Sequence, residues 1–209
     1  GCRVKPARGF ESLLLRHAMN PANYPEEKNL NDRSKLAIKL FHEIAQGARI
    51  HGWQISFLTG FAIDAHFGYL TKNHKDVDII ISKDEAKQLT TYLTTLGHTV
   101  FEVEDTKGEC LKVDHADPER PSQALADLHY FWEEDGKVVI PLKGKKLVFS
   151  GSFSEMTESR KLLGEDITVL KPHYLLEEKK GWCEQVGLSQ CREKPELYQA
   201  DIDKITFLL

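Results

Sequence analysis

The residues best suited to do chemistry are two aspartates that stand two positions apart at the start of an apolar run. Asp76 and Asp78 flank Val77, and the run continues through residues 79–81, all isoleucine. On a β-strand, side chains two positions apart point to the same face, so the two carboxylates would stand side by side. Carboxylates held that close resist joint ionisation unless a cation lies between them. The pattern predicts a divalent metal site at the mouth of a sheet.

A third carboxylate is predicted on a separate strand, Ala124–Trp132. Side chains on one face of a strand recur at every second residue. The residues on the relevant face are Leu125, Asp127, His129 and Phe131. One carboxylate, Asp127, therefore stands among apolar neighbours. Two carboxylates on one strand and a third on a neighbouring strand suffice to bind two metal ions about 4 Å apart.

Each of these aspartates also has a purely structural alternative. Asp127 could be a strand-face charge that forms an ion pair with Lys112 or Lys146. Asp114 and Asp117, in the loop just upstream, are rivals for the role of third ligand. The first aspartate pair, taken alone, could be a solvated loop end that leads into a strand.

An ordered set of short motifs surrounds the first aspartate pair. In chain order the motifs are Thr59-Gly60, Phe61, Ala62-Ile63-Asp64, Thr71-Lys72-Asn73-His74 and Asp76-Val77-Asp78. The set resembles the front of the nucleotidyltransferase superfamily that includes polymerase beta, and most closely the aminoglycoside and lincosamide nucleotidyltransferases. Their pattern is a Gly-Gly turn, an aromatic residue, a small–apolar–Asp triplet, Thr-Arg-x-His and Asp-x-Asp. The order and spacing carry the resemblance, because a bare Asp-x-Asp is uninformative.

The resemblance implies an adenylyltransferase-like enzyme that moves a nucleoside monophosphate from ATP or another NTP to a hydroxyl of a small molecule. The implied acceptor is an aminoglycoside- or lincosamide-like antibiotic. Two Mg²⁺ ions are implied, with Asp76, Asp78 and Asp127 as ligands and Asp127 also as the catalytic base. The implied fold is α/β (α+β), a mixed, twisted sheet flanked by helices, with C-terminal helices. The resemblance covers residues 54–131 well and nothing before residue 30.

The turn Thr59-Gly60 is the predicted phosphate contact. A turn that leads into a helix presents backbone N–H groups to a phosphate. The related enzymes usually carry glycine at the first position, where this chain has Thr59. Its hydroxyl could bond a phosphate oxygen, while its Cβ would crowd the triphosphate. The departure affects the phosphate contact and not the expected fold.

Further residues are expected to bind the nucleotide or to order its loop. Lys72 keeps a cation where the relatives carry Arg, so charge is retained and bidentate geometry is lost. His74 could contact the nucleotide or order the loop. Asp64 is expected to pair with Lys72 or His74 and hold that loop. On a helix after residue 172, either Lys179 or Lys180 would reach the triphosphate, as in related enzymes, although a solvated face is the alternative.

Bulk properties narrow the partners and the compartment. The 209 residues carry 28 Lys+Arg against 32 Asp+Glu, a net charge of −4, which argues against a duplex nucleic acid partner. No apolar run reaches membrane-spanning length, and no apolar signal core follows the basic start. The cysteines Cys2, Cys110, Cys183 and Cys191 form no CxxC pair and predict free thiols in a reducing compartment. We therefore expect a cytoplasmic protein without a membrane partner; nothing specifies an oligomeric state.

The chain is expected to form an arm, residues 1–29, and one domain, residues 30–209. The domain core would span about residues 54–150 and a C-terminal helical part about residues 170–209. Helices are predicted from Asn31 or Asp32 to near Gly52, after a capping box Ser82–Glu85 until Gly97, from Pro172 to about Val186, and from near Pro195. The apolar face of the first helix is expected to consist of Ala37, Leu40, Phe41, Ile44, Ala45 and Ala48. The buried face of the second is expected to consist of Ala86, Leu89, Leu93 and Leu96. Strands are predicted at 54–58, 77–81, 98–104, 109–113, 124–132, 137–142, 145–149 and 167–170.

The same residues permit alternative functions. A non-catalytic nucleotide-binding or interaction domain of the same fold is favoured by Thr59. Retention of all three carboxylates argues against it, since without metal chemistry nothing would keep Asp76 and Asp78 repelling each other. A toxin-type nucleotidyltransferase that acts on a protein or a tRNA is a further alternative. A metal-dependent nuclease would need a basic groove, and none is visible in the sequence.

Overall fold

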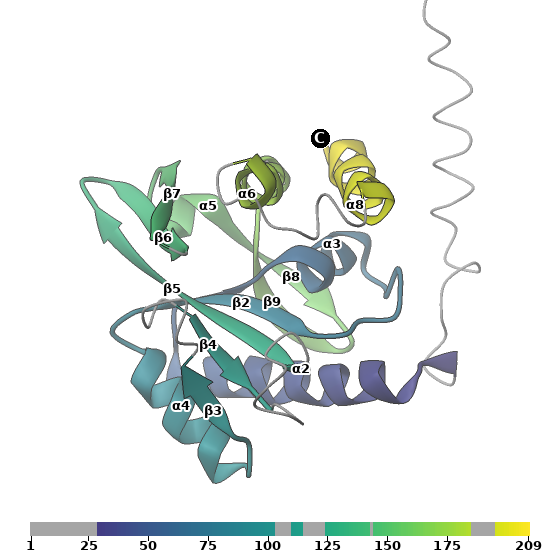
Figure 1. Cartoon of the computed structure of the whole chain (residues 1–209), viewed down its shortest axis with the longest axis vertical. Coiled ribbons are helices and arrows are strands. Elements are labelled where there is room, and N and C mark those ends of the chain that lie inside the picture. Colours follow the sequence, from purple (N-terminus) through teal and green to yellow (C-terminus); the bar gives the residue numbers. More distant parts are fainter. Residues whose placement is uncertain (1–28, 103–109, 115–123, 143, 185–194) are drawn as a thin grey trace, which may run out of the picture.

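The computed structural model describes residues 29–102, 110–114, 124–142, 144–184 and 195–209. They form a mixed, twisted sheet with helices on both faces, as predicted (Figure 1). The strands are β1 (Ile55–Phe57), β2 (Val77–Ser82), β3 (Val100–Glu102), β4 (Cys110–Val113), β5 (Ala126–Glu134), β6 (Lys137–Leu142), β7 (Lys145–Ser150), β8 (Thr157–Leu162) and β9 (Glu165–Leu170). The helices are α2 (Asp32–His51), α3 (Thr59–Phe67), α4 (Ala86–Thr95), α5 (Phe153–Met156), α6 (Pro172–Glu184) and α8 (Pro195–Leu208).

The sheet places β2 and β5 side by side at its centre. The strand order is β3-β4-β5-β2-β1-β9-β8, and β6 and β7 extend the sheet from the far half of β5. β2 and β5 run parallel, and their register sets Asp78 opposite Asp127. Residues opposite each other in a ladder point to the same face. The prediction that Asp127 lies on a neighbouring strand is confirmed.

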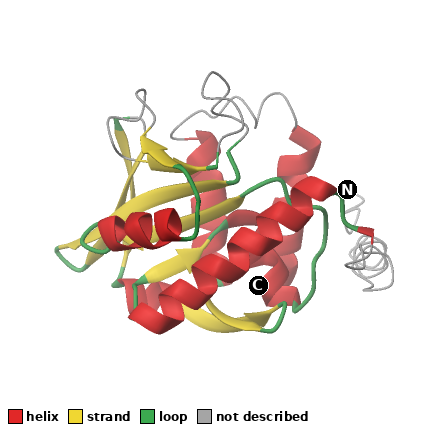
Figure 2. Cartoon of the chain, turned by 90° about the horizontal axis from the view of Figure 1, so that it is seen from below, coloured by secondary structure: helices red, strands yellow, loops and turns green. Residues whose placement is uncertain are grey.

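Helix α2 shows how directly local sequence specifies local structure. Asn31 caps its start by accepting a hydrogen bond from the backbone N–H of Ser34, and Gly52 ends it with a φ of 71°. Five residues of the predicted apolar face are buried in the core, and the sixth, Ala48, is half-buried against it; the five are Ala37, Leu40, Phe41, Ile44 and Ala45. α2 and α4 cover one face of the sheet, and α3, α6 and α8 lie on the other (Figures 1 and 2).

Two details predicted around α4 are wrong. The capping box from Ser82 to Glu85 does not form, because a Glu85 carboxylate oxygen accepts from the backbone N–H of Gln54 at 2.6 Å and the helix begins without a side-chain cap. Leu96, expected on the buried face, is 43% exposed because the helix ends at Thr95. The contact to Gln54 instead fastens the start of α4 to the chain that enters β1.

The segment between β7 and β9 holds two elements that the sequence analysis does not predict. α5 begins at a capping box formed by Ser152 and Glu155. β8 pairs with β9 along its full length through a turn at Leu163 and Gly164, both at positive φ. β8 lies at the edge of the sheet and has three exposed residues in a row at its centre, so its sequence lacks the apolar alternation that marks a half-buried strand.

The remaining expectations concern the termini, the cysteines and the membrane. All of the predicted arm except residue 29 lies outside the described residues. Cys110 is a buried, reduced thiol, but Cys183 is disulfide-bonded, so the prediction of free thiols is wrong there and cysteine usage no longer argues for a reducing compartment. Among the described residues, none of the helices combines the length and the apolar character that a membrane crossing requires.

Candidate active site

The three predicted carboxylates meet at one end of β2 and β5. Asp78 lies opposite Asp127, and Asp76 immediately precedes β2. Burial raises the pKa of the Asp78 carboxyl well above its usual range, and the charges of Asp76 and Asp127 raise it further. Burial, and then the charge of Asp127, also raises the pKa of Asp76. Crowded carboxylates that resist ionisation, with oxygen ligands only, fit a divalent ion such as Mg²⁺.

The first turn of α2 holds the two chain segments that deliver these carboxylates. Arg33 donates from Nε to the carbonyl oxygen of Lys75 at 2.6 Å and from Nη2 to that of Ala124 at 2.5 Å. These carbonyls lie just before Asp76 and just before β5. The positive charge of Arg33 also opposes the rise in the pKa of Asp76. Sequence reasoning misses Arg33, because a single arginine in the first turn of a helix carries no motif.

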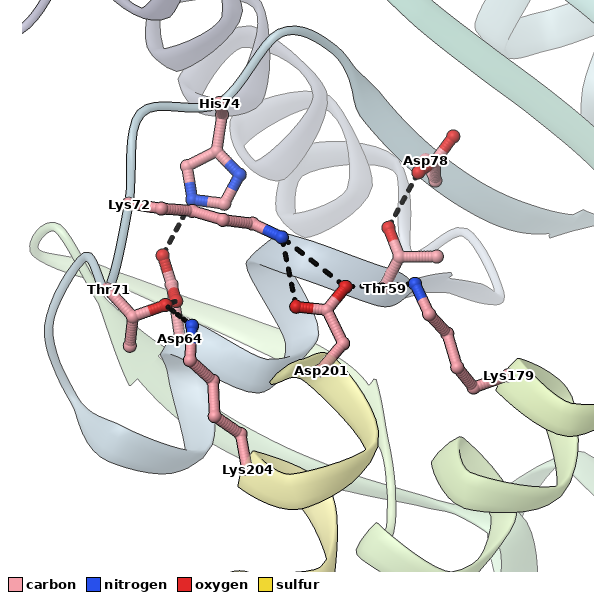
Figure 3. A network of polar contacts seen from close by, with 9 residues as sticks. All are labelled: Thr59, Asp64, Thr71, Lys72, His74, Asp78, Lys179, Asp201 and Lys204. Carbon is pink, nitrogen blue, oxygen red and sulfur yellow. Dashed lines mark hydrogen bonds and ion pairs between the residues drawn. The ribbon is translucent and has the colours of Figure 1, made fainter. Parts of the chain in front are cut away.

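A buried aspartate orders the loop that leads to β2 (Figure 3). Asp64 is fully buried and accepts hydrogen bonds from Thr71 Oγ1 and His74 Nε2, both at 2.6 Å. The His74 ring stacks on Phe61 at a centroid distance of 4.1 Å. A Cβ on Gly60 would lie 2.8 Å from that ring, so glycine is required for this packing. The predicted pairing of Asp64 with His74 is confirmed, and the burial of His74 fits the loop-ordering alternative.

Thr59 contacts the carboxylate pair directly. Its backbone has a φ of 45°, in the left-handed region that favours glycine, which agrees with the glycine that related enzymes carry here. Its Oγ1 donates to Asp78 Oδ2 at 2.6 Å, and this hydrogen bond lowers the pKa of Asp78 against the larger effect of burial. The Thr59 hydroxyl is therefore hydrogen-bonded to Asp78, a predicted metal ligand, in place of the predicted contact with a phosphate (Figure 3).

Three lysines gather around one aspartate beside Thr59 (Figure 3). Asp201 of α8 pairs with Lys72 Nζ at 3.0 Å and with Lys179 Nζ at 2.9 Å. Lys204, one turn further along α8, donates to Thr71 Oγ1 at 2.9 Å, and burial followed by the charge of Lys72 lowers its pKa. Lys72 and Lys179 thus direct two ammonium groups at the single carboxylate of Asp201, and ammonium groups gathered in this way suit a polyanion. Lys72 therefore pairs with Asp201 and not with Asp64.

The structure distinguishes Lys179 from Lys180 on α6, a choice that the sequence leaves open. The Lys179 side chain is only 17% exposed and faces Asp201, whereas Lys180 is exposed. The preceding residue, Glu178, is fully buried, and burial raises its pKa to about 7. Its charge makes a small contribution to the raised pKa of Asp78.

Asp127 also forms the ion pair with Lys112 that was the structural alternative to a metal-binding role. Lys112 Nζ donates to both carboxylate oxygens of Asp127, at 2.5 and 2.6 Å, from the opposite position on β4. Burial alone would lower the pKa of Lys112, but the charge of Asp127 raises it. The rival Asp114 instead bonds the ring of His98, and Asp117 lies outside the described residues.

This combination of a mixed sheet, an Asp-x-Asp strand, a third aspartate on the adjacent parallel strand and a cluster of lysines defines a nucleotidyltransferase. The chain belongs to the aminoglycoside-2''-adenylyltransferase family, whose model matches residues 41–174, more than half of the chain. The predicted resemblance and the predicted enzyme class are thus confirmed. No curated protein sequence gives a significant match.

Solved structures share the fold at low sequence identity. A crystal structure of the lincosamide antibiotic adenylyltransferase LnuA, with lincomycin bound, is 13% identical over 86% of this chain and 99% of its own, with a TM-score of 0.55. A solution structure of the antibiotic-resistance factor ANT(2'')-Ia is 17% identical over 84% and 90%, with a TM-score of 0.56. A crystal structure of ANT(2'')-Ia in complex with adenylyl-2''-tobramycin is 18% identical over 82% and 93%, with a TM-score of 0.54.

Asp78→Asn is expected to stabilise the metal-free protein at pH 8. The folded-state pKa of Asp78 is raised, so the native state binds the proton more tightly than the unfolded chain, and stability falls as pH rises from the unfolded value toward the folded one. Asn removes this penalty and still accepts from Thr59. Scanning calorimetry in a chelator should show a melting temperature higher by at least about 2 °C at pH 8, with a smaller gain near pH 5.

Magnesium supplies the matching control. Added Mg²⁺ should raise the melting temperature of the wild type and leave that of Asp78→Asn unchanged, because ligands stabilise only the state that binds them. A variant that melts lower than wild type at pH 8 in chelator, or that gains as much from Mg²⁺, contradicts the account of this site.

Proposed function

We propose that the protein transfers the adenylyl group of ATP to a hydroxyl of an antibiotic, an aminoglycoside or a lincosamide, with two Mg²⁺ ions. The observation that carries the proposal is the convergence of Asp76, Asp78 and Asp127 beside the lysines around Asp201. The family match supports the adenylyl donor. The acceptor class is supported by the neighbours, one with lincomycin bound and one with adenylyl-2''-tobramycin.

Each carboxylate has a role in the proposed reaction. Asp76, Asp78 and Asp127 would hold the ions. When bound, Mg²⁺ offsets the charge that develops on the phosphate oxygens. Asp127 takes the proton of the acceptor hydroxyl, whose oxygen forms a bond to the α-phosphorus in line with the leaving group. The bond between the α-phosphorus and the bridging oxygen breaks, and pyrophosphate leaves with that electron pair.

The lysines have the complementary role of binding the triphosphate. Lys72 and Lys179 would exchange the carboxylate of Asp201 for phosphate oxygens, to which ammonium groups bind as point charges. Asp201 holds both ammonium groups beside Thr59 in the absence of nucleotide (Figure 3). Backbone N–H groups at the start of α3 would add neutral donors. His74 and Lys180 stay predicted nucleotide contacts from the sequence, but the burial of the first and the exposure of the second favour other roles.

A non-catalytic nucleotide-binding domain is the second candidate. Two contacts favour it, because both draw on the proposed metal ligands: the Thr59 hydroxyl donates to Asp78, and the Lys112 ammonium donates to both oxygens of Asp127. Such a domain would bind Mg²⁺ and ATP at the same residues and give no product. An assay of product formation therefore separates the two candidates.

The proposed function is tested by mass spectrometry of the acceptor. The protein, ATP and Mg²⁺ are incubated with panels of aminoglycosides and lincosamides, and separately with protein and tRNA acceptors. We expect an antibiotic that gains one AMP with release of pyrophosphate. Asp127→Asn should reduce the rate at least about 100-fold, because the base is lost. AMP transfer only to protein or tRNA, or ATP binding without any product, contradicts the proposal.

Lys179→Met is expected to weaken ATP binding, with Lys180→Met as its matched control. Lys179 faces Asp201 and the carboxylates, whereas Lys180 is exposed on the same helix. Loss of one charge-assisted phosphate contact should raise the Kd for Mg-ATP about tenfold or more. The control should stay within about twofold of wild type, since it removes an equal charge at the surface. Equal effects in equilibrium dialysis would rule out a specific role for Lys179.

A further inference from the structure

A second group of potential metal ligands lies beside the carboxylates, on β4 and β5. Cys110 and His129 are opposite each other in this antiparallel pair, and Asp127 lies two residues before His129 on the same face. Each offers one ligand atom, and these atoms all lie within 4.8 Å of one another. Within the described part of the chain this is the one group of three His, Cys, Asp or Glu side chains with such compact ligand atoms.

An unsatisfied imidazole nitrogen gives this group a second, independent feature. His129 is 7% exposed, and its Nδ1 has no hydrogen-bond partner among the described residues. The Trp182 ring of α6 packs against it at a centroid distance of 4.8 Å, which shields it from solvent. Buried polar atoms are normally paired, and those that are not call for an explanation such as an absent ion. Cys110, opposite, is buried as well.

We propose that Cys110, Asp127 and His129 form a binding site for a softer divalent cation, with the chemistry of Zn²⁺. Thiolate, imidazole and carboxylate are the ligands that zinc takes, whereas Mg²⁺ requires oxygen ligands. The cysteine binds as a thiolate, and its proton passes to the solvent. Three protein ligands leave the fourth tetrahedral position for water.

Lys112 does not block this site. A carboxylate offers about four acceptor positions, so the two hydrogen bonds from Lys112 leave lone pairs on both oxygens of Asp127. The ammonium charge opposes a nearby cation, which weakens binding without preventing it. The two negative ligands, Cys110 as thiolate and Asp127, balance the charge of one divalent ion.

The consequence is competition for Asp127, and this part of the inference rests on the proposed function. A zinc ion held by Cys110 and His129 would direct the carboxylate of Asp127 away from the Mg²⁺ side of the sheet end. It would also remove the proposed base from the acceptor hydroxyl. Zinc should therefore inhibit adenylyl transfer even at saturating Mg²⁺, because Cys110 and His129, which take no part in the proposed reaction, would hold it against Asp127.

The site is tested with Co²⁺, a spectroscopic probe that replaces zinc. The protein is treated with chelator, dialysed and titrated with CoCl₂ alone. We expect one equivalent to bind with a thiolate-to-cobalt charge-transfer band and the visible absorption of a tetrahedral ion. The band should disappear in Cys110→Ser and persist in a variant that keeps Cys110 but carries serine in place of Cys2, Cys183 and Cys191.

His129→Gln provides an independent variant in case Cys110→Ser does not fold. It should raise the Kd for Co²⁺ at least tenfold while the circular dichroism spectrum stays that of the wild type. Absence of the charge-transfer band in the wild type, or its persistence in Cys110→Ser, overturns the site. Neither measurement requires catalytic activity, so failure of the proposed function leaves this test intact.

Inhibition is tested separately, once an acceptor is in hand. Zn²⁺ should slow adenylyl transfer by the wild type at saturating Mg²⁺ and should inhibit Cys110→Ser at least tenfold less strongly. If Co²⁺ gives the expected spectrum but Zn²⁺ inhibits both proteins equally, the competition for Asp127 is refuted.

Discussion

Electrostatic repulsion between carboxylates that the sheet forces together is the constraint on which this site depends. The parallel register of β2 and β5 sets Asp78 opposite Asp127, and strand geometry leaves neither backbone free to move away. Burial adds to the repulsion, so the pKa of Asp78 rises well above its usual range. Each polar contact nearby can be understood as a response: Thr59 donates to one carboxylate, and Lys112 donates to the other. This repulsion lowers the stability of the metal-free protein, and a bound cation would relieve it.

The lysines of the site are also brought together by distant segments of the chain. Lys72 from the loop before β2 and Lys179 from α6 share the carboxylate of Asp201 on α8. Three segments far apart in the chain therefore contribute to a cluster that sits beside the start of α3 (Figure 3). The proposed metal-binding carboxylates and the proposed triphosphate-binding lysines lie on either side of Thr59. This arrangement would suit the two parts of a metal–triphosphate complex, which is why we propose ATP as the substrate.

Sequence reasoning recovers features that short-range patterns specify. The apolar period of α2, the Asp-x-Asp pair and the alternation on β5 each describe one face of one element, and the structure has these elements as expected. Sequence reasoning fails where a contact between distant segments determines the position of a side chain. The Glu85 side chain accepts a hydrogen bond from the backbone of Gln54 and does not form the predicted capping box. Arg33 donates to one carbonyl in the segment before β2 and to another in the segment before β5. The choice between Lys179 and Lys180 likewise needs the packing of α6, and the polar edge strand β8 has no apolar period to detect.

The most direct test is calorimetric titration of ATP into the protein with and without Mg²⁺, for the wild type and for Asp76→Asn/Asp78→Asn. The account predicts Mg²⁺-dependent ATP binding by the wild type and none by the double variant, which should remain folded because it loses the repulsion. Binding that is unaffected by the double substitution, or equally strong without Mg²⁺, would contradict the claim that these carboxylates form a metal-dependent nucleotide site.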